Sequence, residues 1–152
     1  MAGPEMTKLT RMFGAITAPG VRKVHGLTGP IDDAFMDSFI MVRPTGTGNP
    51  GITKWVGTEM EHAITHWRRQ FRGEARVKDD KDVTEIDIAS SNLILWGDPK
   101  SNAIIAKIAD RLPIAWTPET IQIGDSKYPS AEHTLVAIYP NPLNPKKYIV
   151  LN

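Results

Sequence analysis

The sequence predicts an α/β domain built on a short, mostly parallel sheet. The first observation is the continuously apolar segment 92–97, as expected for a strand whose two faces are both covered in a parallel sheet. The second is a segment with helical apolar spacing, 101–112, which follows it directly. The third is composition: 41% hydrophobic and 23% charged residues in a chain of 152 are sufficient for one compact domain and are not typical of disorder.

The N-terminal part predicts an arm and one strand. Residues 1–30 are rich in Gly, Pro, Thr and Lys, and we expect an extended arm ahead of a single domain at 31–152. Residues 39–42 form a short apolar run that ends at Pro44 and a glycine-rich loop, 45–51. A short run closed by turn residues predicts a buried strand.

A long amphipathic helix is predicted next. In 53–71, apolar residues recur at the helical period, so that one face is directed to the core, and Gly73 supplies a stop. The highly charged segment 74–82 is expected to be solvated. Thr84 and Asp87 have the spacing of a capping box and predict the start of a short helix.

The segment that follows predicts a βαβ unit. After the strand 92–97 and the helix 101–112, residues 113–116 are expected to re-enter the sheet through a right-handed crossover.

The C-terminal part predicts three more short strands or hairpins. Residues 120–128 indicate a small hairpin, 134–139 an apolar strand, 140–145 a proline-locked loop and 148–151 a last strand. We therefore expect three layers and four or five strands, of flavodoxin-like or Rossmann-like character. In this fold, 92–97 and 134–139 would lie in one parallel core.

Composition disfavours several function classes. The chain has 18 basic and 17 acidic residues, a net charge of +1, which gives no field to attract nucleic acid. It has no cysteine, so disulfides and thiolate metal sites are excluded. No apolar run approaches the roughly 20 residues that a membrane span needs. Residues 1–19 lack a basic region followed by an apolar one, which predicts no signal peptide. We expect no cofactor.

Ser101 lies at a predicted strand–turn–helix junction, where a hydrolase nucleophile could be exposed, with Asp98 and His133 as the other members of a triad. The glycines that flank such a serine two residues away are missing, because Pro99 and Ala103 take their places. A helix N-cap formed by Ser101 or Asp98 is the favoured interpretation.

The same turn is a candidate for small-anion binding. Free N–H groups at the start of a helix attract negative charge, and open parallel sheets bind ligands at the carboxyl ends of their strands. The residues involved would be Asp98, Lys100, Ser101 and Asn102.

A second serine hydrolase hypothesis uses Asp125 and Ser126. Gly124-Asp125-Ser126 is similar to the GDS block of SGNH-type esterases, and His133 follows seven residues after Ser126. The order argues against it, since that block lies near the N-terminus in those enzymes. A turn in a hairpin is the favoured interpretation.

Two histidines on the predicted helix could bind a metal. His62 and His66 are one helical turn apart, with Glu59 on the same face. The H-E-x-x-H order is missing and no third ligand from another segment is evident, so a solvated polar face is favoured and no metal is expected.

Four segments of the chain, in this order, carry a family resemblance: 29–37 (GPIDDAFMD), 67–73 (WRRQFRG), 91–102 and 138–151. They resemble the C-terminal region of large bacterial proteins of the prolyl-oligopeptidase-like or α/β-hydrolase-like group, many of them exported. The resemblance covers roughly residues 23–152. It implies an α/β region outside the serine hydrolase signature, since the chain has no G-x-S-x-G.

The resemblance implies a non-catalytic accessory or interaction domain of a hydrolase-family protein. Its partner would be a catalytic domain or another protein, and a homo-oligomer is a further possibility. It implies an exported protein and a fragment of a longer chain. The alternatives are a small free-standing esterase, using Ser101 or Ser126 with His133, and small-anion binding at 98–102.

Overall fold

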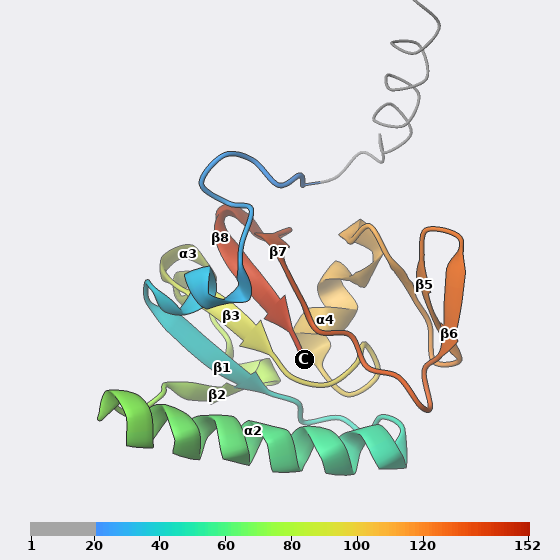
Figure 1. Cartoon of the computed structure of the whole chain (residues 1–152), viewed down its shortest axis with the longest axis horizontal. Coiled ribbons are helices and arrows are strands. Elements are labelled where there is room, and N and C mark those ends of the chain that lie inside the picture. The colour runs from blue at the N-terminus through green and yellow to red at the C-terminus, as the bar shows by residue number, and fades with distance from the viewer. Residues whose placement is uncertain (1–20) are drawn as a thin grey trace, which may run out of the picture.

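The computed structural model describes residues 21–152, and a five-stranded sheet organises this part of the chain (Figure 1). The strand order is β2-β1-β3-β8-β7, in which the first four strands are parallel and β7 lies antiparallel to β8 at one edge. The prediction of an α/β fold with a mostly parallel sheet is therefore confirmed. The strands are β1 (Phe39–Arg43), β2 (Val77–Asp79), β3 (Asn92–Leu95), β7 (Ala137–Asn141) and β8 (Asn144–Leu151).

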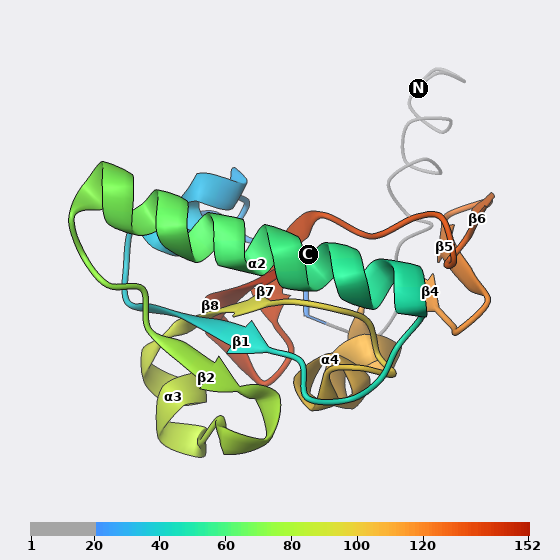
Figure 2. The same ribbon diagram turned by 90° about the horizontal axis from the view of Figure 1, so that it is seen from below.

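Helical elements cover both faces of the sheet (Figure 2). The long helix α2 (Pro50–Phe71) and the turn η1 (Ile31–Phe35) lie on one face, and α3 (Glu85–Ser90) and α4 (Ala103–Ile108) lie on the other. Two short 3₁₀ turns, η2 (Asp80–Asp82) and η3 (Ala109–Arg111), flank these last helices.

The central strands are apolar because alternate side chains enter two separate cores. In β3, Leu93 and Leu95 pack towards α4, whereas Ile94 packs towards α2. All three are at most 1% exposed. The polar side chain of Asn92 fixes the start of this strand, because its Nδ2 donates to the η1 carbonyl of Ala34 and its Oδ1 accepts from Tyr148 N.

Helix α2 begins three residues before the predicted start. Asn49 caps it by accepting a hydrogen bond from Gly51 N at 3.0 Å, and Pro50 fits its first turn. The helix ends at Phe71, as predicted, but the left-handed residue after it is Arg72 (φ 57°) rather than Gly73.

A second, small antiparallel sheet contains β4 (Ala115–Trp116), β5 (Thr120–Ile123) and β6 (Ser126–Pro129). The predicted hairpin at 120–128 is confirmed. The prediction that 113–116 re-enters the main sheet is wrong, because β4 pairs with β5. The two residues of β4 extend the β5–β6 hairpin to three strands.

Two strand predictions need correction at the edges of the main sheet. The segment 134–139 joins the same sheet, but β7 is an antiparallel edge strand, and the central parallel neighbour of β3 is β8. The segment 140–145, predicted as a proline-locked loop, is the turn and adjoining strand ends of the β7–β8 hairpin, where Asn141 Oδ1 accepts from Leu143 N at 2.9 Å. The segment 74–82, predicted to be solvated, instead contains edge strand β2, whose residues are half-buried, and the buried Asp80.

Of the predicted arm, residues 1–20 lie outside the described part of the chain. Residues 21–30 contact the β7–β8 hairpin: Tyr139 Oη donates to Val21 O, and Gly29 N donates to Tyr148 Oη. Within residues 21–152, no helix has the length and apolarity needed to cross a lipid bilayer.

Because of the capping box of α3, we expect the free energy of unfolding to depend on pH in the acid range. The carboxylate of Asp87 accepts from Lys78 Nζ and Thr84 Oγ1, both at 2.7 Å, and from Thr84 N. The hydrogen bond from Lys78, opposed by burial and assisted by Thr84, lowers the pKa of Asp87 from 3.8 to about 2.

We expect Asp87→Asn to lower the free energy of unfolding by about 1–2 kcal/mol at neutral pH. Because the folded pKa is below the unfolded one, the stabilisation is complete above pH about 4 and is lost as pH falls to about 2. The variant should therefore lose part of this acid dependence in urea titrations. Glu85→Gln, in the same helical turn with a side chain 87% exposed, is the control. Equal acid dependence in Asp87→Asn and the unmodified chain would contradict the prediction.

Candidate functional site

The carboxyl ends of the parallel strands bring together the loops after β1, β2 and β3. This edge is the usual ligand-binding edge of an open α/β sheet. The predicted residues Asp98, Lys100, Ser101 and Asn102 all lie in the loop after β3, so the structure places this set where the sequence predicted.

A buried carboxylate from the loop after β2 joins the three loops. Asp80 is 3% exposed and accepts from Ala103 N at 2.7 Å and Lys81 N at 3.0 Å, and also from the hydroxyl and backbone N–H of Thr45. Burial raises the pKa of Asp80, but these hydrogen bonds together lower it below its usual value. The N-terminus of α4 therefore already has an anion, supplied by the chain itself.

The turn at 98–102 is closed by its own hydrogen bonds. Asp98 Oδ1 accepts from Lys100 N at 2.9 Å and from Ser101 N at 2.8 Å, and Asp98 O accepts from Asn102 N at 2.9 Å. Pro99 has no N–H. An anion at this turn would need open N–H groups, and the geometry offers none between residues 99 and 102.

The hydroxyl of Ser101 points into the same turn. Its Oγ accepts from Asp98 N at 2.9 Å and lies 3.3 Å from Asp98 O, and the residue is 5% exposed. Asn102 is the N-cap of α4, since its Oδ1 accepts from Ile104 N and Ile105 N. These residues have structural partners, and the geometry does not support a nucleophile elbow at Ser101.

The sequence analysis missed a glycine pattern in the loop after β1. Gly46, Gly48 and Gly51 have the G-x-G-x-x-G spacing of dinucleotide-binding loops, between a strand and a helix. In such loops the glycines let a phosphate approach the backbone. Here a Cβ on Gly48 would lie 2.4 Å from Asp98 Oδ2, and one on Gly46 2.9 Å from Lys100 O. These two glycines therefore allow the loop after β3 to pack directly against the loop after β1.

The second predicted triad is not assembled. Asp125 and Ser126 lie at the exposed tip of the β5–β6 hairpin. The ring of His133 lies beside Tyr128, and its Nδ1 is 3.1 Å from Pro129 O. Within residues 21–152, no serine hydroxyl forms a hydrogen bond with a histidine.

The histidine pair on α2 has no further ligands. The rings of His62 and His66 stack with centroids 5.7 Å apart, and Glu59 lies one turn before His62. Among the described residues, no group of three His, Cys, Asp or Glu side chains comes together to hold a metal ion.

A cleft of about 490 Å³ lies beside these loops, between the N-terminus of α2 and the small sheet. Figure 1 shows how these two parts of the fold face each other. Four separate segments line the cleft: 48–52, 98–100, 116–118 and 130–134. The loop after β3 and the loop after β6 therefore bring Asp98, Lys100 and His133 to the same cavity.

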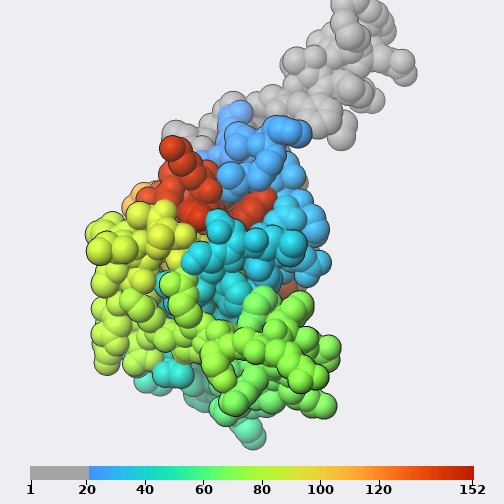
Figure 3. All heavy atoms as spheres, turned by 90° about the vertical axis from the view of Figure 1, so that its left-hand side faces the viewer, coloured from blue at the N-terminus to red at the C-terminus, as the bar shows by residue number. Residues whose placement is uncertain are grey.

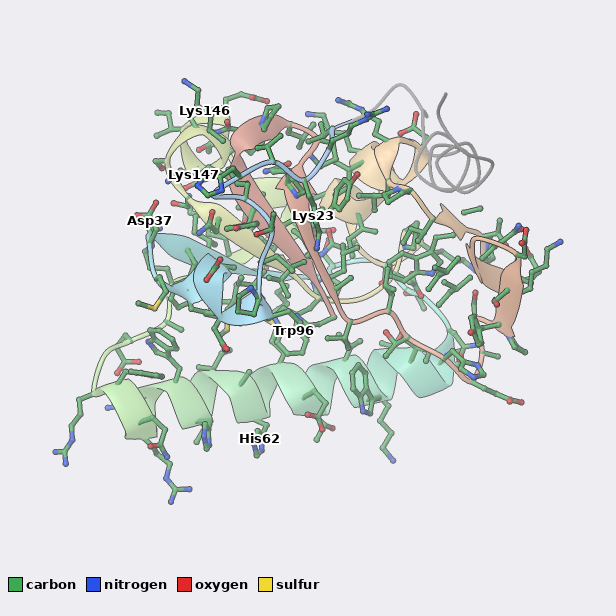
Figure 4. The ribbon with its side chains drawn as sticks, turned by 45° about the horizontal axis from the view of Figure 1, so that its top comes forward. Lys23, Asp37, His62, Trp96, Lys146 and Lys147 are labelled. Atoms are coloured by element: carbon green, nitrogen blue, oxygen red, sulfur yellow. The ribbon has the colours of Figure 1, made fainter. Side chains whose placement is uncertain are left out.

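A second hollow, the apolar groove, runs between η1 and α2 and has a volume of about 530 Å³. Figure 4 shows Trp96 between the sheet and α2. Trp96 is 6% exposed, and its indole Nε1 is buried without a hydrogen-bond partner among the described residues. The lining of the groove includes Phe35, Met36, Trp67, Phe71 and Trp96.

The apolar face of the predicted helix 53–71, which includes Trp67 and Phe71, was expected to be directed to the core. Phe35, Phe39, Trp67 and Phe71 do contact one another, with neighbouring ring centroids 4.4–5.8 Å apart. Phe71, however, is 66% exposed. Trp67 and Phe71 are aromatic residues one turn apart at the end of the predicted helix, and this pair is the sequence signal that could have located the groove.

The chain was compared with protein-family models, curated proteins and solved structures, and none matched.

The closure of the carboxyl edge by Asp80 is testable. Asp80→Asn replaces a carboxylate oxygen with an N–H donor that faces other donors, and we expect a loss of about 2–3 kcal/mol in the free energy of unfolding. Asp82→Asn, an exposed acidic residue of the same turn, should change it by less than about 0.5 kcal/mol. Equal values for the two variants in urea unfolding would show that Asp80 does not hold the loops together.

The serine hydrolase hypotheses are also testable. Since the Ser101 hydroxyl is buried and Ser126 has no histidine partner, we expect no hydrolysis of p-nitrophenyl acetate above background. Ser101→Ala, Ser126→Ala and His133→Ala should give the same rate as the unmodified chain. A rate that falls in one serine variant and in His133→Ala would establish a serine enzyme and contradict this reading.

Proposed function

We propose that the chain is a non-catalytic accessory domain of a hydrolase-family protein, with a three-layer fold of flavodoxin-like or Rossmann-like character. It binds a catalytic domain through the apolar groove between η1 and α2. The identity of the partner rests on the resemblance in the sequence, and the place of contact rests on the geometry of the groove.

The observation that supports this proposal most is that one end of the groove is apolar and exposed. Met36 is 84% exposed and Phe71 66% exposed, and both line the groove. Figure 3 shows the end of the molecule where the last turn of α2 and the segment around the start of β1 come to the surface side by side. Aromatic and methionine side chains are enriched in protein interfaces, and charged ones are depleted in their centres.

The groove also has a polar feature that a protein partner can satisfy. An N–H group that is buried without a partner costs roughly 1–3 kcal/mol. Trp96 lines the groove, and its buried Nε1 is such a group. A backbone carbonyl or side-chain oxygen of the partner would accept this hydrogen bond while an apolar side chain fills the groove.

The esterase alternative has weaker support. Ser101 has internal partners, Ser126 lies exposed at the tip of a hairpin, and the ring of His133 contacts Pro129 O. The anion-binding alternative is disfavoured because the carboxylate of Asp80 already accepts a hydrogen bond from the N-terminus of α4.

The test uses the catalytic domain of a prolyl-oligopeptidase-like protein from the group that the sequence resembles, prepared without its own C-terminal region. We expect a 1:1 complex in isothermal titration calorimetry, weakened about tenfold or more by the double change Met36→Asp and Phe71→Asp. Both side chains are exposed, so the fold should be retained.

The matched control is Ile86→Asp, a residue 78% exposed on α3, on the opposite face of the sheet. It should leave the affinity unchanged. The absence of heat at micromolar concentrations, or equal weakening by Ile86→Asp, would contradict the proposal. Self-association that disappears in the double variant, measured by sedimentation, would replace the catalytic domain with a second copy of the chain.

A further inference from the structure

From the cleft beside α2, we infer a second, separate binding site whose ligand is a neutral polyhydroxylated ring, a sugar of one or two residues. The cleft does not share residues with the apolar groove, so this inference is independent of the proposed partner. Its volume of about 490 Å³ falls within the range of about 300–1,000 Å³ that is typical of small-molecule sites.

The walls of the cleft are apolar and partly aromatic. Trp116 from the small sheet and Ile52 from the first turn of α2 both line it and are half-buried, with Pro50, Pro99 and Pro118 around them. An indole and proline rings in the lining of one cleft provide apolar surface for the C–H face of a ring-shaped ligand. Because prolines lose little freedom on binding, such a surface costs little to order.

The polar groups at the cleft include both donors and acceptors. Lys100 carries an ammonium with three N–H donors and is exposed. Asp98 uses its Oδ1 for the turn, and its Oδ2, which packs against Gly48, is the oxygen left to accept a further hydrogen bond. The net charge of this pair is zero.

His133 adds a directed nitrogen. A carbonyl oxygen can only accept, so the contact of 3.1 Å between Nδ1 and Pro129 O places a proton on Nδ1. In the neutral ring, Nε2 is then an acceptor for a ligand hydroxyl.

Thr134 supplies an unused hydroxyl. Its Oγ1 is buried and has no partner among the described residues, although the residue lines the cleft. A buried hydroxyl without a partner is costly, and a ligand hydroxyl that pairs with it would remove that cost.

The mixture of hydrogen-bond donors and acceptors in the cleft favours one class of ligand. A carboxylate such as acetate has only acceptors and would face the Asp98 carboxylate and the lone pair of His133 without a proton to give, and phosphate would bring a second negative group to Asp98. A cation would face Lys100. A sugar hydroxyl both donates and accepts, so one ring can satisfy the ammonium, the carboxylate and the imidazole while its C–H face covers Trp116.

The test is ¹H–¹⁵N NMR titration of the full chain with glucose, xylose, cellobiose and maltose, and separately with inorganic phosphate and acetate. We expect at least one sugar to shift the Trp116 indole and the Lys100 and Thr134 amide signals saturably, and the anions to leave them unchanged. Lys100→Ala and His133→Ala should each weaken this binding about two- to tenfold, the effect of one lost hydrogen bond.

Trp116→Ala should abolish the binding, whereas Trp55→Ala, an exposed tryptophan of α2 outside the cleft, should not change it. Trp116 also packs on the core, so the lysine and histidine variants carry the decision if Trp116→Ala unfolds. No saturable shift with any of the four sugars, shifts with phosphate or acetate, or sugar shifts unchanged in both Lys100→Ala and His133→Ala would overturn the inference. A failure of the proposed interaction at the apolar groove would not affect the inference of a sugar site in the cleft.

Discussion

Two-sided burial of the parallel strands is the constraint on which the rest of the structure depends. A parallel strand in a sheet has no face that can remain in water, so each apolar side chain of β1, β3 and β8 needs a covering element. On one face α3 and α4 provide it. On the other, the single helix α2 and the short turn η1 share five strands, and they leave the apolar groove between them.

The same constraint explains the polar residues at the strand ends. Loops that follow parallel strands converge at one edge, where their backbone groups lose water and need partners. Asp80 and Asn102 provide these partners from within the chain. A residue type that is common in active sites is therefore used here for closure. The glycines of the first loop serve this closure too, because they allow the loop after β3 to approach closely.

Much of the fold could be predicted because its signals are local. The apolar run 92–97, the period of 53–71 and the pair Thr84–Asp87 each reflect a short-range rule, and each element is present. The strand β2 could not be predicted, because an edge strand is half-buried and its Val-Lys-Asp sequence has no apolar pattern. The antiparallel direction of β7 depends on a hairpin turn within 140–145, which the prolines concealed as a loop.

The sites were predicted less well because they depend on which segments meet. Sequence placed Asp98 and Lys100 correctly at a strand end, but the partners of Asp98 come from its own turn. The cleft also needs Trp116 from the small sheet and Thr134 from the loop after it. Residue types alone suggested a nucleophile at Ser101; only burial and donor geometry distinguish a reactive hydroxyl from one that closes a turn. The apolar groove and the cleft lie along the same helix, one beside its C-terminal half and one at its N-terminus. A rigid helix of 22 residues can hold two such surfaces at a fixed separation, so a partner and a small ligand could bind the chain at the same time.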